Sequence, residues 1–177
     1  MVELVSKNYA RALFDLAVEE NLVEDTGEEM KVIVSILMSE KSFYEFFVTP
    51  LVSKQEKIEL VDKAFAGRVT KTAENFLKVL IENGRTNTIE AVSTYYHKMK
   101  LEHLNMIEAT AFTVIPMTDL QQQKLTQKLE KETGKKVILK NEIDQDILGG
   151  MLIKIGEKEI DGTVLNRLKN LEAVISK

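Results

Sequence analysis

The spacing of the apolar residues changes once along this chain, near Asn105, and this change constrains the fold more than any other feature. Before Asn105 apolar side chains recur every three or four residues, and after it a two-residue alternation begins. The first spacing is typical of helices with one buried face, whereas alternation rich in β-branched residues indicates a strand. We therefore expect a helical unit followed by a small unit that combines strands and helices.

The composition divides at the same place. Ten of the eleven aromatic residues precede residue 105, and five of the eight glycines follow it. Residues 1–105 carry 13 basic and 17 acidic side chains, while residues 106–177 carry 11 of each. Such a shift predicts two domains, 1–105 and 106–177.

The first domain is expected to be an antiparallel bundle, because its helices are short and its loops are short. Several expected helices begin with a hydroxyl residue followed three positions later by glutamate, the capping-box pattern. The expected helices are 2–21, 26–39, 42–48, 53–66, 70–83 and 87–105; the capping pairs are Thr26–Glu29, Ser42–Glu45 and Ser53–Glu56, with Asn87–Glu90 as a weaker version. The fifth carries the clearest apolar stripe: Ala73, Phe76, Leu77, Leu80 and Ile81.

The second domain is expected to be a small α+β module in the order β-α-β-β-α. Its expected elements are a strand over 106–115, a helix from Thr118 to Gly134 with Leu120, Leu125 and Leu129 on one face, strands at 137–139 and 151–155, a return at Ile160 and a last helix over 162–176. A core built from about 70 residues is marginal alone, so this module is expected to lean on a partner.

Composition also excludes several classes of function. The chain has no cysteine, which excludes disulfide scaffolds, thiolate zinc sites and cysteine nucleophiles. Its net charge of −4 argues against a dedicated nucleic-acid binder. No apolar run approaches the length of a membrane span, and the N-terminus lacks the core of a signal peptide. Any membrane contact is expected to be indirect, through a partner.

Candidate chemical sites lack the spacing that their chemistry requires. Gly149-Gly150 and the stretch 156–162 contain no phosphate-binding loop and are interpreted as turns. Asp144 and Asp146 lack the further oxygen ligands of a calcium loop. His97 and His103 are six residues apart, and Ser93 has no orienting acid, so we expect no catalytic, cofactor-binding or metal site.

The first expected helix carries more apolar surface than its own packing requires. Its apolar arc is about twice the roughly 100° stripe of a surface helix. Two interpretations remain open from the residues alone: a central position in the bundle, or a second face that binds a partner. Val79 lies outside the main stripe of the fifth helix, beside Phe76. A groove between the first and fifth helices would accept an amphipathic helix.

Three ordered segments resemble the delta subunit of bacterial F-type ATP synthases, the counterpart of the mitochondrial oligomycin-sensitivity-conferring protein. The first is Y-A-R-A-L-F at residues 9–14, and the second is E-N-G-R at 82–85. The third and most specific spans 143–171, with I-L-G-G-M-L-I-K-I-G-E followed by I-D-G-T and a helix containing R-L. The resemblance covers nearly the whole chain.

The resemblance implies a mainly helical protein with a six-helix bundle and an α+β module, acting as a non-catalytic stator subunit without a cofactor. It implies binding of the N-terminal helix of an alpha subunit in the groove of helices one and five, through Ala10, Phe14, Val18 and Val79, while Tyr9, Leu13, Leu16 and Leu80 remain core. The second domain would bind the b subunits of the peripheral stalk, through Val164, Leu168, Leu171 and Ile175. The expected location is peripheral, at the cytoplasmic face of the cell membrane.

Two other functions were weighed. A small enzyme would need a convergent acid, base or phosphate cradle, which the sequence does not offer. A free-standing helical adaptor explains the bundle and leaves the α+β module without a role.

Overall fold

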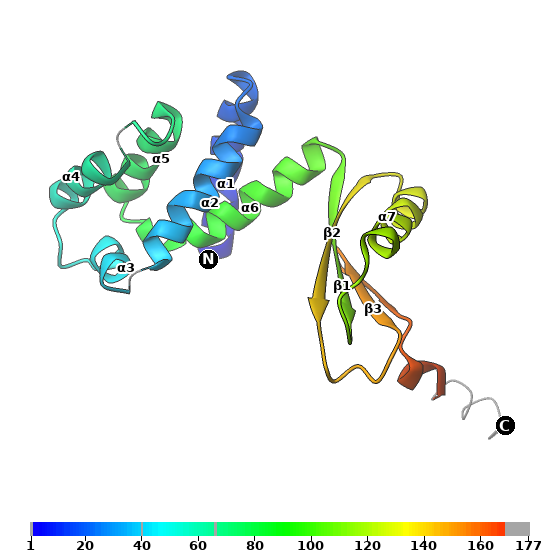
Figure 1. Cartoon of the computed structure of the whole chain (residues 1–177). Helices are drawn as coiled ribbons and strands as arrows, with labels where there is room; N and C mark the ends of the chain where they lie inside the picture. The colour runs from blue at the N-terminus through cyan, green and yellow to red at the C-terminus, as the bar shows by residue number, and fades with distance from the viewer. Residues whose placement is uncertain (1, 40, 66, 169–177) are drawn as a thin grey trace. The chain divides into compact units, whose positions relative to one another are not determined.

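The computed structural model describes residues 2–39, 41–65 and 67–168. It is predominantly helical, with a small four-stranded mixed sheet in its C-terminal part (Figure 1). The chain divides into two compact units, Met1–Lys100 and Leu101–Lys177, and each is described by itself.

The first unit is built from helices around one apolar core. Its elements are α1 (Val2–Glu19), α2 (Val23–Ser39), α3 (Lys41–Val48), α4 (Lys54–Phe65), α5 (Lys71–Glu82), the 3-10 turn η1 (Thr86–Thr88) and α6 (Ile89–His103), whose last residues belong to the second unit. The largest fully buried side chain is Tyr96 of α6, whose hydroxyl donates to the Val23 carbonyl oxygen at 3.0 Å. Burial raises the pKa of Tyr96 to about 12.

The helix starts show where local patterns hold. Ser53 and Glu56 form the predicted capping box at the start of α4, with the Glu56 carboxylate accepting from the Ser53 backbone at 3.0 Å. The predicted pair Thr26–Glu29 is wrong, because α2 already begins at Val23 and Thr26 is buried inside it. The Glu29 carboxylate instead accepts from the backbone N–H and hydroxyl of Thr70, the residue that caps α5. This carboxylate therefore ties α2 to the start of α5.

The stripe predicted for α5 is confirmed. All five of its apolar residues are buried, and the helix ends at the predicted Asn83-Gly84 stop. Lys78, on another face of α5, contacts Asp62 of α4 at 2.7 Å and Glu74 at 2.7 Å. These carboxylates hold the pKa of Lys78 above its ordinary value, and they join α4 to α5.

The second unit is a sheet with one helix against it. Its elements are β1 (Met106–Thr113), α7 (Asp119–Thr133), β2 (Lys136–Ile143), β3 (Met151–Ile155) and β4 (Lys158–Asp161), followed by a helix that begins at Val164 and is described to Leu168. The strand order is β2-β1-β3-β4, with β1 parallel to β2 and antiparallel to β3 (Figure 1). The parallel pair is joined by α7, as a parallel connection requires.

One face of the sheet packs on α7. The buried residues Ala109 and Ala111 of β1, Val137 of β2 and Ile153 of β3 form a small core with Leu129 of α7. Thr118 and Gly134 cap α7 as predicted. Leu120, expected on the packed face, is exposed instead, because its position lies on the solvent side of α7.

The glycines before β3 form a turn, as the sequence indicated. Gly150 has φ +84°, and a Cβ there would overlap the carbonyl oxygen of Gly162. The Gly162 N–H in turn donates to the Met151 carbonyl oxygen at 2.9 Å. The second glycine is therefore required by a close backbone crossing and a positive φ.

Candidate functional site

The titratable residues considered at the sequence level do not assemble into a chemical site. Over the residues that the structure describes, no group of three or more acidic or histidine side chains is arranged to hold a metal ion. Asp144 accepts the backbone N–H of Asp146 at 3.0 Å in a turn. Within the same described ranges, no helix is both long and apolar enough to cross a bilayer.

An apolar groove lies between α1 and α5, where the sequence placed one. It has a volume of about 250 Å³ and is lined by Ala12, Leu13, Leu16, Glu20, Thr72, Asn75, Phe76 and Val79. At its floor the rings of Tyr9 and Phe76 meet edge to face, with centroids 6.3 Å apart. Glu20 closes one end by accepting from the Thr72 hydroxyl at 2.7 Å.

The four side chains predicted for this groove take different positions. Val79 lines it and is 42% exposed. Ala10 is fully buried in the core of the unit, so its side chain offers no binding surface here. Phe14 packs edge to face on Tyr96, with centroids 5.7 Å apart, on the flank of α1 that faces α6. Val18 is 37% exposed, and at 100° per residue it lies near Phe14, away from the groove.

Two groove residues on α1 were missed, Ala12 and Leu16. Leu16 was expected in the core, but it is 41% exposed and lines the groove. The buried stripe of α1 consists of Ser6, Ala10, Leu13 and Ala17. Three of these four are small, and small residues allow neighbouring helices to approach closely. That stripe of small residues was the signal that would have oriented α1 and placed Leu16 at its edge.

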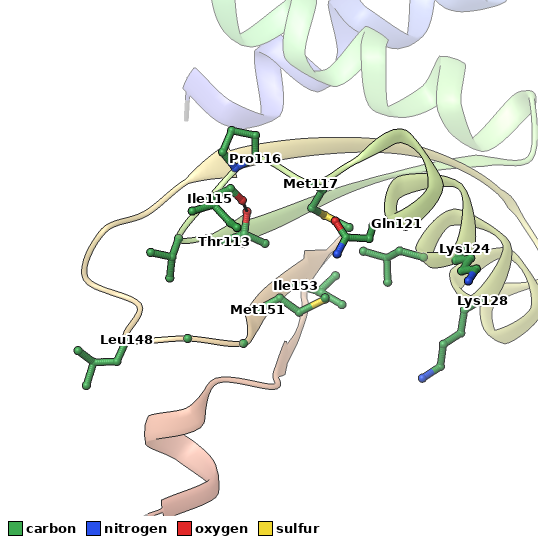
Figure 2. Close-up of a pocket in the computed structure, with 14 residues that line it drawn as sticks. Thr113, Ile115, Pro116, Met117, Gln121, Lys124, Lys128, Leu148, Met151 and Ile153 are labelled. Carbon is green, nitrogen blue, oxygen red and sulfur yellow. Dashed lines mark hydrogen bonds between the residues drawn. The ribbon is translucent and has the colours of Figure 1, made fainter.

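A larger recess lies in the second unit, beside α7 (Figure 2). Its volume is about 770 Å³, and its lining comes from the end of β1, the loop 114–117, α7, and the segment 148–153. Ile115 and Leu148 are 72% and 78% exposed. The recess exists because β1 and β3 are paired with Thr113 opposite Met151, so the loop after β1 meets the loop before β3.

The last helix was predicted to bind a partner through four residues. Val164 and Leu168 are exposed, as is their neighbour Leu165. Leu171 and Ile175 lie outside the described residues. The described part of this helix starts against the second unit, with the Val164 N–H donating to the Gly149 carbonyl oxygen at 2.9 Å.

Comparisons with known proteins agree on one family. Residues 5–175 match the family model "ATP synthase delta (OSCP) subunit". Two curated relatives carry the name ATP synthase subunit delta. That of Alkaliphilus oremlandii is 39% identical over 177 residues, which cover 100% of this chain and 98% of the relative. That of Clostridioides difficile is 36% identical over 177 residues, which cover 99% and 98%.

A solved structure gives a second line of comparison. A chain in the structure of the Toxoplasma gondii mitochondrial ATP synthase hexamer superposes with a TM-score of 0.72, at 20% identity and 97% coverage of both chains. At that identity the likeness speaks for the fold alone, while the family model and the full-length relatives decide the family. The chain belongs to the ATP synthase delta (OSCP) subunit family.

Proposed function

We propose that this chain is a non-catalytic stator subunit of an F-type ATP synthase, peripheral at the cytoplasmic face of the cell membrane. It would link the catalytic head to the membrane sector through the peripheral stalk while ions, protons or sodium, drive ATP synthesis. The observation that carries this proposal is that a member of the delta (OSCP) family has an exposed apolar recess on each of its two units. Such recesses suit stable contacts with other subunits.

The N-terminal unit, as a six-helix antiparallel bundle, would bind the N-terminal helix of an alpha subunit in the α1/α5 groove. Leu16 and Val79 face each other across an apolar floor, which matches the apolar face of an amphipathic helix. Among the groove residues Glu20 is already bonded to Thr72, so the groove supplies contact area more than charge.

The C-terminal unit would bind the b subunits. The exposed side chains of Val164 and Leu168 support a contact through the last helix, because apolar groups at the start of that helix face solvent in the free chain. The apolar recess beside α7 adds a second surface on the same unit.

Titration of the full chain with a labelled peptide of the alpha subunit N-terminus, followed by fluorescence anisotropy, tests the proposal. Leu16→Glu and Val79→Glu should each weaken binding at least about tenfold, since a carboxylate would be desolvated in the groove. Val18→Glu is the matched control, because it makes a similar change on the other flank of α1 and should change the affinity less than about twofold. Absence of saturable binding to the wild type, or an equal loss from Val18→Glu, would overturn the assignment.

A further inference from the structure

The recess beside α7 differs from the α1/α5 groove in the charge of its walls. Two of its lining residues, Lys124 and Lys128, are basic, and none of its lining residues is acidic. Apart from Gln121 and Thr113, its other lining side chains are apolar or glycine. The recess is therefore an apolar floor with a positive edge.

The two lysines are placed to act together. They stand four residues apart on α7, so their side chains lie on one face of the helix, with Cβ atoms about 6 Å apart. Both are exposed, and no carboxylate among the described residues forms an ion pair with either. Figure 2 shows them on the α7 side of the recess, with Ile115 and Leu148 on the other side and Met151 and Ile153 between.

The apolar part of the recess is open in the free chain. Ile115 and Leu148 expose most of their surface, and covering such side chains is favourable by about 25 cal/mol per Å². Met117 and Met151 line the floor, and methionine adapts its shape to the side chain that it meets. The described part of the last helix does not fill the recess: in Figure 2 it leads away from the two lysines.

We propose that this recess binds an amphipathic helix of the b subunit that presents an apolar face toward Ile115 and Leu148 and two carboxylates, one helical turn apart, toward Lys124 and Lys128. This inference rests on the proposed function, because it names the chemistry of the b-subunit segment that the C-terminal unit holds. The carboxylates fix the register of the partner helix, since only one placement pairs both with lysines spaced four residues apart. The apolar face supplies most of the contact area.

The test measures binding of the soluble part of the same synthase's b subunit to the full chain by isothermal titration calorimetry. Lys124→Glu/Lys128→Glu should weaken binding about tenfold, because two attractive pairs become repulsive. Lys136→Glu/Lys158→Glu is the matched control. These lysines are also exposed, and they lie toward the other end of the sheet, opposite Met106 and Ile155. The control should change the affinity less than about twofold.

A second variant tests the apolar half. Ile115→Ser/Leu148→Ser should also weaken binding about tenfold, and it should leave the fold intact because both side chains are exposed. Raising the salt from about 0.05 to 0.5 M should weaken the wild type more than Lys124→Glu/Lys128→Glu, since only the wild type retains the pairs to be screened.

The outcomes separate the two levels of the proposal. If b binds the wild type and both lysine double variants equally well, the recess assignment is wrong and the stator function stands. If b binds tightly only after removal of residues 169–177, the chain's own terminus occupies the recess and the assignment is likewise wrong. If b does not bind the wild type at all, both the stator function and the recess assignment fail.

Discussion

The two units bury their apolar residues to very different extents. Among the residues that the structure describes, the core of the first unit contains 18 buried apolar residues and that of the second contains five. The first unit can therefore place a groove at its edge without weakening its centre. The second unit leaves Ile115, Leu148 and Val164 exposed around a small core, which is the arrangement expected of a module completed by a partner.

The largest expected effect tests this difference with one substitution in each unit. Leu77→Ala in the first core should lower the free energy of unfolding of that unit by about 2–5 kcal/mol, because a fully buried side chain leaves a cavity. Leu129→Ala in the second core should cost nearer the low end of that range, since a thin layer collapses more readily around the gap. Amide hydrogen exchange measures each unit separately. An equal or larger cost at Leu129 would contradict the contrast between the cores.

A smaller effect tests how far the second unit depends on its backbone. Gly150→Ala should destabilise it by about 2 kcal/mol or more, because the new Cβ combines a positive φ with overlap on the Gly162 carbonyl. Gly134→Ala is the control: it has φ +69° with open space around it, and it should cost only about 1 kcal/mol. Thermal unfolding of the two variants compares them, and equal costs would show that the backbone crossing is unimportant.

The smallest expected effect depends on pH. The buried Lys100 of α6, and then Lys31, hold the pKa of Glu28 below its ordinary value, with Lys100 Nζ 2.7 Å from the carboxylate. A lowered pKa stabilises the fold above the unfolded-state value of about 4.5, and that stability disappears as the pH falls through the folded value. Because Glu28 is 62% exposed, Glu28→Gln should cost less than about 1 kcal/mol at pH 7.

Chemical denaturation at pH 7 and pH 3 measures this difference, which should shrink at the lower pH. Glu157→Gln, an exposed substitution in the turn between β3 and β4, should show no such dependence. A cost for Glu28→Gln that is the same at both pH values would contradict the role of the ion pair.

The sequence predicted elements well where their determinants are local. The stripe of α5, the capping box at Ser53, the limits of α7 and the strand 151–155 are each set by neighbouring residues, and each is confirmed. Glu29 shows the opposite case, because its partner Thr70 is 41 residues away and no local pattern reveals it.

The candidate surfaces were predictable only in part, for a physical reason. A helix that is apolar over much of its circumference does not reveal which face packs, so Val18 was placed in the groove and Leu16 in the core. The recess beside α7 joins side chains from two loops whose meeting depends on strand pairing, as with Ile115 and Leu148. Its lysines belong to α7, whose sequence alone does not show that they border an apolar floor.

The crossing of Gly150 and Gly162 also restricts how this sequence can drift. A side chain at position 150 would collide with a peptide carbonyl, which cannot swing aside as a side chain can. At position 162 a Cβ would lie 3.1 Å from the Met151 carbonyl oxygen, which a shift of a few tenths of an ångström relieves. Substitution is therefore steeply asymmetric across one contact: relatives that keep the crossing can exchange the later glycine for alanine, and they have no alternative to the earlier one.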